Sequence, residues 1–236
     1  MSPSDTEPPC IASLLADARA HVTRLTNNLP TEVDPLAVSL KSKTPYLALC
    51  FREGQAWRAE EFARAACDMF ERGDDVVGVS NTRGAVESVA AIWYLKCLIE
   101  GEIERGVASA DVYAHLKQLH LGSRSDNAFP KAINATTMLK KADAEIPGVW
   151  RSYELMSEFG HPNYWGSAGV FGSPDRETLI TYFGKGLRKN MYPARLGLTC
   201  LIAAMGTLFH AYNKISDMTP DFAKACEREN PHGSAT

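Results

Sequence analysis

None of the cysteines in this chain stands in a pattern that metal binding or redox chemistry requires. The sequence has six cysteines, but it has no C-x-x-C pair and no Cys/His tract with zinc-finger spacing. Most of them have apolar neighbours in the sequence, where a free thiol behaves as a small hydrophobic side chain. We therefore expect reduced cysteines, most of them in the core, rather than a disulfide framework.

The sequence also lacks the short motifs of several common enzyme classes. No serine stands in G-x-S-x-G, and the Gly-Lys-Ser/Thr of a phosphate-binding P-loop is absent. No fixed-period repeat is present. These absences argue against an α/β-hydrolase, a P-loop enzyme and a solenoid repeat protein. We expect no cofactor and assign no metal ligand.

Neither an excess of positive charge nor a long apolar run is present. The formal net charge is -3, which argues against a protein that coats nucleic acid, although a local basic patch is compatible with it. The first ten residues do not resemble a signal peptide. The most apolar stretch, residues 196–209, is shorter than the roughly 20 residues of a membrane span. We expect a buried core helix there, no membrane partner and a cytoplasmic location.

Helical periodicity is what the sequence does contain. From Ile11 to Leu25 the apolar residues recur in steps of three and four, which is typical of one face of a helix. Similar patterns predict an all-α, single-domain bundle of about seven to eight helices, without strands. A long helix is expected at 75–104, another beginning at Pro174-Asp175, and a last one at 193–215. We expect a disordered segment at 1–10, the bundle at 11–216 and a loose polar tail at 217–236.

The polar run from Ser157 to Asn163 is the most informative feature of the sequence, and the densest cluster of site-type residues lies at 161–166. Glu158 and His161 have E-x-x-H spacing, which on a helix allows both to reach one metal ion. Gly160 and Pro162 instead predict that the helix ends next to His161. A histidine in that place can serve as an acid or a base. Alternatively, His161 and Asn163 only fasten the loop by hydrogen bonds.

Three further residues belong to the candidate site, together with Tyr164 as a binding residue. Arg83 and Glu87 lie four apart on the long predicted helix, so they share one face. They form a solvated surface pair, a buried structural pair or a functional pair, and the spacing does not choose between these. Arg124, in the turn-rich loop at 121–130, could present its side chain to an anion.

Three segments of the chain together resemble a known group of proteins. They are the helix opening at 82–87, the loop at 122–124 and the run at 153–163, which ends in Glu-x-x-His-Pro-Asn. The pattern covers residues 43–215 and resembles a group of uncharacterised bacterial helical proteins, which are in turn similar to HEPN domains. That resemblance implies a helical bundle, often a homodimer, that binds or acts on RNA or a nucleotide, commonly in bacterial defence.

The chain departs from the HEPN nucleases at its candidate histidine. Those nucleases have a histidine four to six residues after an arginine, whereas His161 lies ten residues after Arg151. The nuclease activity is therefore not implied by the motif. Arg83 could still meet His161 from a different helix.

Three functions fit these residues. In the first, a HEPN-like protein holds phosphate with Arg83 and Arg124, and His161 handles a proton. In the second, a metal-dependent enzyme uses Glu87, Glu158 and His161 as its catalytic cluster. In the third, a non-enzymatic helical module binds a partner, and the polar cluster only locks the bundle.

Overall fold

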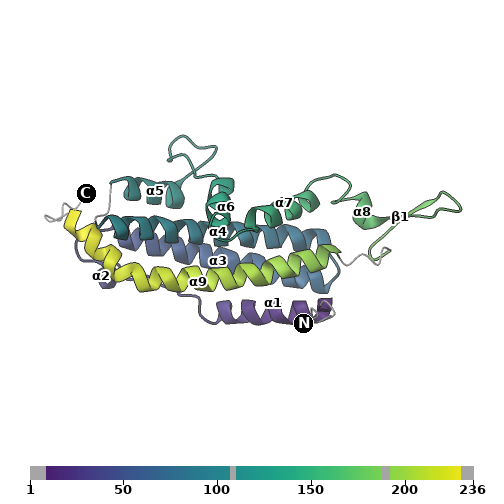
Figure 1. The fold of residues 1–236 in the computed structure, drawn as a ribbon, viewed down its shortest axis with the longest axis horizontal. Coiled ribbons are helices and arrows are strands. Elements are labelled where there is room, and N and C mark those ends of the chain that lie inside the picture. The colour runs from purple at the N-terminus through teal and green to yellow at the C-terminus, as the bar shows by residue number, and fades with distance from the viewer. Residues whose placement is uncertain (1–8, 107–109, 188–191, 230–236) are drawn as a thin grey trace, which may run out of the picture. The chain divides into compact units, whose positions relative to one another are not determined.

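The computed structural model describes residues 9–106, 110–187 and 192–229 and confirms the all-α class (Figure 1). Within these ranges the chain forms nine helices and one two-stranded sheet. The helices are α1 (Ile11–Thr26), α2 (Pro35–Val38), α3 (Thr44–Glu71), α4 (Asp75–Arg105), α5 (Ala110–Leu121), α6 (Ala135–Asp143), α7 (Val149–Gly160), α8 (Ala168–Phe171) and α9 (Tyr192–Glu229). The strands are β1 (Gly172–Pro174) and β2 (Thr181–Phe183). Two of these nine helices, α2 and α8, have only four residues each.

The described residues divide into two compact units. Unit 1 takes in residues up to 27, 60–86 and 151–205, and unit 2 takes in 28–59, 87–150 and the residues from 206 onward. The helices α3, α4 and α9 each contribute residues to both units.

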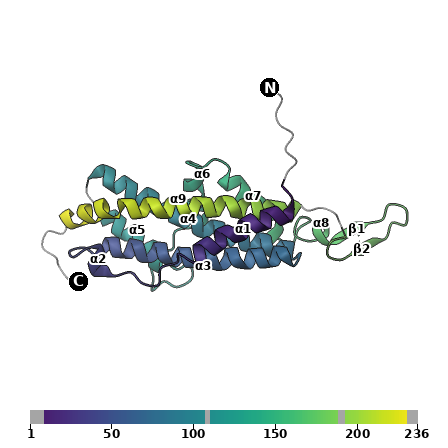
Figure 2. The same ribbon diagram turned by 90° about the horizontal axis from the view of Figure 1, so that it is seen from below.

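Unit 1 buries the apolar face of α1 that the sequence predicted. Figure 2 shows α1 beside α3, and the Arg19 guanidinium bonds the Asp68 carboxylate of α3 at 3.0 Å. Phe70 of α3 leaves no room for larger residues at two glycines. A Cβ would lie 2.6 Å from its ring at Gly78 of α4 and 2.2 Å at Gly197 of α9. The glycines thus allow three helices to approach one aromatic ring.

Unit 2 is built on the apolar side of α4 and on a buried polar network between α3 and α9. Ile92, Leu95 and Ile99 of α4 are fully buried. The side chains of Arg52 and Glu53 are buried as an ion pair. The Tyr212 hydroxyl donates to Glu53 at 2.9 Å, and the Arg52 guanidinium lies 4.0 Å over the Tyr212 ring.

The helix predicted to begin at Pro174-Asp175 is wrong, because this segment is a β-hairpin. The Asp175 carboxylate accepts hydrogen bonds from the backbone N–H groups of Glu177 and Thr178, which folds the chain into a turn. Leu179 completes the turn with a positive φ of 60°. Asp175, expected at the start of a helix, therefore forms the turn, and the β-branched and aromatic residues after the turn form β2.

The loose tail predicted from residue 217 is also wrong as far as the structure describes it. The last helix, α9, continues through Glu229 and contains Pro220. It continues because Phe222 and Cys226 are buried four residues apart and extend the apolar face beyond Ile215. Residues 1–8 of the predicted disordered segment lie outside the described residues.

The helix α9 is much longer than the predicted 193–215. By length and composition alone it could cross a membrane, with a mean hydropathy of 1.3 in its most apolar window, of which 44% is buried. The core helix of a soluble protein meets the same two criteria. The burial of Leu198, Leu201 and Leu208 agrees with the core helix that the sequence predicted.

The buried ion pair of unit 2 makes a stability prediction. Glu53→Ala strands the Arg52 charge and should lower the free energy of unfolding by about 3–5 kcal/mol. Lys224→Ala, which removes the partner of Asp221 in an ion pair exposed on both sides, should cost about 0–1 kcal/mol. Urea denaturation of both variants measures the difference, and equal losses would contradict the structural role of the buried pair.

Candidate functional site

Helix α7 ends as the sequence predicted, with His161 directly after it. Its buried residues Tyr153, Met156 and Phe159 are spaced three apart and face the core of unit 1. That face leaves Glu158 and His161 exposed to solvent. His161 therefore stands at the carbonyl end of the helix.

Arg83 of α4 reaches the same end of α7. Its guanidinium lies 5.2 Å over the ring of Tyr153, a distance at which a cation is attracted to the ring face. A Cβ built on Gly160 would lie 3.3 Å from one nitrogen of Arg83. The structure thus places Arg83 against the last residue of α7, next in the chain to His161.

The polar residues after α7 fasten the loop that follows. The Asn163 amide donates to the Glu158 carboxylate at 2.7 Å, and its carbonyl oxygen accepts from the Gly166 N–H at 3.1 Å. The Ser167 hydroxyl donates to the backbone carbonyl oxygen of Asn163. Glu158 and Asn163 therefore hold the loop. The alternative from the sequence gave this role to His161 and Asn163, and these bonds agree with it for Asn163.

An aromatic cluster lies over the same loop. Trp165 packs edge-on against Phe159 at 6.2 Å and against Tyr164 at 5.9 Å between ring centroids, and it also contacts Tyr192 of α9. Gly169 allows this close packing, since a Cβ there would lie 2.6 Å from the Tyr164 carbonyl oxygen. Even so, about half of the surface of Tyr164 and Trp165 stays exposed.

Glu87 and Arg124 are described with unit 2. The Glu87 carboxylate lies 3.7 Å from the Arg58 guanidinium, which also donates to the Ser88 hydroxyl. Arg124 is exposed and donates to Asn134, the residue that caps α6, at 3.2 Å. Their grouping with His161 stays a prediction.

A cleft of about 210 Å³ in unit 1 is lined by the start of α4 and the segment 169–171. Two of its charged lining residues are paired, because Lys185 donates to the Asp74 carboxylate. That bond holds the pKa of Asp74 below its usual value, whereas burial raises the pKa of Asp75. The Lys185–Asp74 pair thus anchors the chain that follows β2 to the start of α4.

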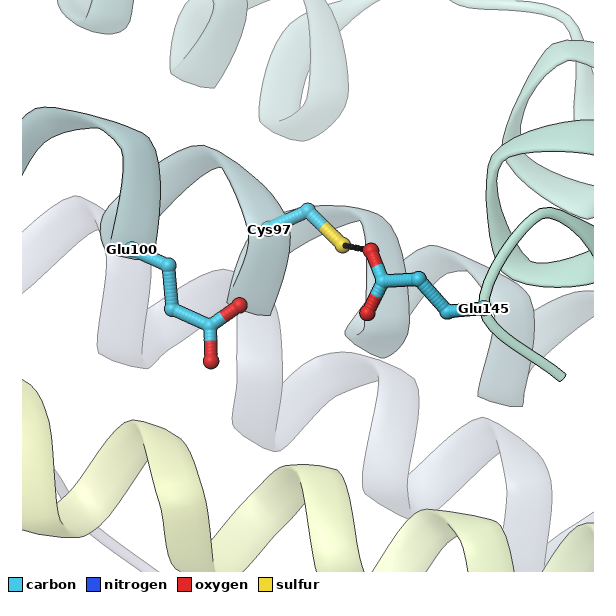
Figure 3. Close-up of side chains that lie close together, drawn as sticks. All are labelled: Cys97, Glu100 and Glu145. Atoms are coloured by element: carbon cyan, nitrogen blue, oxygen red, sulfur yellow. Dashed lines mark hydrogen bonds between the residues drawn. The ribbon is translucent and has the colours of Figure 1, made fainter.

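A polar cluster that no sequence motif indicated lies between α4 and the segment after α6. Figure 3 shows Cys97, Glu100 and Glu145, whose potential ligand atoms lie within 4.8 Å of one another. The Cys97 thiol donates to Glu145 at 3.0 Å. The Lys96 ammonium bonds Glu100 at 2.8 Å and Glu145 at 3.0 Å. The spacing of Lys96 and Glu100 is visible in the sequence, but Glu145 is distant and exposed, and no motif points to it.

The charged groups of this cluster neutralise one another, with the Lys96 ammonium as the cation between two carboxylates. Burial, and then the bond to Glu145, raise the pKa of the Cys97 thiol to about 12. The pKa of Glu145 is lowered, first by the bond from Cys97. Burial alone would lower the pKa of Lys96, but its two carboxylates outweigh it and raise that pKa. A metal ion would have to displace the ammonium and remove the thiol proton.

Comparison with protein-family models, with curated proteins and with solved structures finds no match for this chain. The resemblance to HEPN domains therefore stays an expectation from the sequence.

The cluster predicts how fast Cys97 reacts with thiol reagents. Glu145→Gln removes the carboxylate that disfavours a thiolate, so the pKa of Cys97 should fall and its alkylation by iodoacetamide at pH 9 should become faster. The rate is followed by peptide mass spectrometry, with Glu154→Gln on the exposed face of α7 as the control. An unchanged rate in Glu145→Gln would show that Glu145 does not hold the thiol proton.

Proposed function

We propose that this chain binds a nucleotide or a single-stranded RNA segment at the end of α7. The observation that carries the proposal is the approach of Arg83 to Gly160, which brings a guanidinium to the helix end where His161 is exposed. Arginine recognises phosphate, and its charge does not depend on pH in the physiological range.

The neighbouring aromatic side chains support a nucleotide rather than a simple anion. Tyr164 and Trp165 offer exposed ring surface, on which a base can stack without regard to its identity. The Glu158 carboxylate reduces the local positive charge. The site therefore suits a singly charged phosphodiester better than a triphosphate.

His161 is the group of this site that would handle a proton. It is exposed, and the Glu158 carboxylate beside it is already bonded to Asn163. We propose that His161 contacts the phosphate or the ribose of a bound ligand. Cleavage of RNA would be a further step, to be tested separately.

A second candidate function is favoured by the contacts of Asn163. Its side-chain amide donates to the Glu158 carboxylate and accepts from the Gly166 N–H, and such a pair of bonds indicates a structural role in the loop. On this proposal the chain is a non-enzymatic helical module, and the polar residues only shape the loop.

Binding of fluorescein-labelled single-stranded RNA, followed by anisotropy at fixed salt, tests the first proposal. Arg83→Gln should weaken binding, and Trp165→Leu should weaken it about 5- to 150-fold, because stacking of one base is worth about 1–3 kcal/mol. Arg176→Gln removes the same charge from an exposed site on the hairpin and is the matched control.

Two results would overturn the binding proposal. One is the absence of saturable binding by the wild-type protein to RNA and to nucleoside monophosphates. The other is an equal loss in Arg83→Gln and Arg176→Gln, which would indicate general electrostatic attraction. If Asn163→Ala loosens the loop in hydrogen exchange and no binding is found, the helical-module function is favoured.

A further inference from the structure

The hairpin formed by β1 and β2 exposes large apolar side chains that unit 1 does not cover. All three residues of β2 are exposed. Of the apolar residues in the hairpin and just after it, the following are between 45% and 85% exposed: Leu179, Ile180, Tyr182, Phe183 and Leu187. Figures 1 and 2 show the hairpin extending from α8. Because successive residues of a strand point to opposite faces, both faces of β2 carry exposed apolar groups.

The hydrogen bonds of the hairpin show which backbone groups β2 directs outward. Gly184 donates to Phe171, and Asp175 donates to Ile180, so these are hydrogen-bonded pairs of the antiparallel ladder. The register continues through the pair of Ser173 and Tyr182. Since bonded and non-bonded pairs alternate, the N–H and C=O groups of Thr181 and Phe183 point away from β1.

The two edges of this sheet differ in their capacity to accept another strand. In β1, the outward position Pro174 has no N–H to donate. In β2, the run from Leu179 to Phe183 contains no proline and no charge, and most of its residues favour strands. Edge strands are usually protected by charge, proline or a covering element. Within the described residues the sheet has two strands, so the outer edge of β2 has no strand neighbour there.

We propose that the outer edge of β2 pairs with β2 of a second copy of this chain. The two strands run antiparallel about a twofold axis that passes beside Tyr182. In that register Thr181 of each copy exchanges both backbone hydrogen bonds with Phe183 of the other. Tyr182 then faces Tyr182 as a non-hydrogen-bonded pair, and the result is one four-stranded sheet.

The exposed area favours a second copy as the occupant. The exposed parts of the five apolar residues amount to roughly 600 Å², if each large side chain has on the order of 200 Å² of surface. Two copies would together bury at most about 1,200 Å², a maximum that reaches the lower bound for a specific stable interface. A self-complementary edge also provides its own partner at equal concentration, and a four-stranded sheet is more stable than an isolated hairpin.

Disulfide cross-linking tests the register directly in the full-length chain, with Cys10→Ser to remove an exposed thiol. Tyr182→Cys should form a covalent dimer on mild oxidation, because paired residues at this position have Cα atoms about 4.5 Å apart, within disulfide range. Ile180→Cys is the matched control, since Ile180 and Tyr182 are 51% and 52% exposed. In the proposed register the two copies of residue 180 are roughly 13 Å apart and should not cross-link.

Sedimentation equilibrium across the micromolar range tests the free energy of association without a cross-link. Thr181→Pro removes an outward N–H and leaves the bonds between β1 and β2 intact, so it should weaken dimerisation at least tenfold. Thr181→Val keeps the N–H and should leave the dimer unchanged. Circular dichroism checks that both variants fold.

Three results would overturn the proposal. They are a wild-type protein that stays monomeric over this range, equal cross-linking of Tyr182→Cys and Ile180→Cys, and a dimer that Thr181→Pro does not weaken. A monomer that nevertheless binds an added strand-forming peptide at β2 would assign the edge to a heterologous partner and would reject the second copy.

Discussion

Each charged side chain that the long helices bury meets an opposite charge on the same helix, and two of these pairs constrain how the segments of unit 2 pack. A charge transferred into a protein interior without a partner is costly, so each buried charge must keep its partner within reach. The pairs are Arg52 with Glu53, Lys96 with Glu100, Arg64 with Glu60, and Arg105 with Glu102. The first two pairs also reach groups outside their own helix, Tyr212 and Glu145, so they fix the alignment of neighbouring segments.

This constraint separates structural polar clusters from the candidate site. Around Lys96 the donors and acceptors satisfy one another, and the high pKa of the Cys97 thiol keeps its proton in place. A ligand would have to break these hydrogen bonds and ion pairs, which disfavours binding at this cluster. The end of α7 differs, because the bond between Glu158 and Asn163 shapes a loop that leaves His161 and the Trp165 ring at the surface. Binding residues commonly lie on loops that a scaffold of regular elements positions.

Local sequence patterns predicted those helices and helix ends that depend on residues close together in the chain. Apolar steps of three and four placed α1, and the Gly160–Pro162 pair placed the end of α7, because both depend on neighbours in the chain. The hairpin was missed because Pro174-Asp175 fits a helix start as well as a turn. Only the bonds that Asp175 accepts distinguish the two. The end of α9 was missed because burial of Phe222, not local polarity, decides where the helix stops.

The candidate site was partly predictable for the same reason. Its residue types and the helix end beside His161 are visible in the sequence, whereas the approach of Arg83 to Gly160 depends on the packing of α4 against α7. The sequence could offer this approach only as a hypothesis. The cluster at Cys97 was not found at all, since Glu145 is separated from it by 48 residues and stands in no motif.

The hairpin and the loop of the candidate site are mechanically linked through α8. At one end of α8 the Gly169 N–H donates to the Tyr164 carbonyl, and at the other the Gly184 N–H donates to Phe171. Lys185 adds an anchor on Asp74, the residue directly before α4. A strand paired along β2 would reduce the motion of the hairpin, and these short bonds would pass that restraint to the loop that carries Tyr164. Strand pairing would therefore lower the entropy lost when a ligand orders the loop, and association and ligand binding would favour each other without a change of shape.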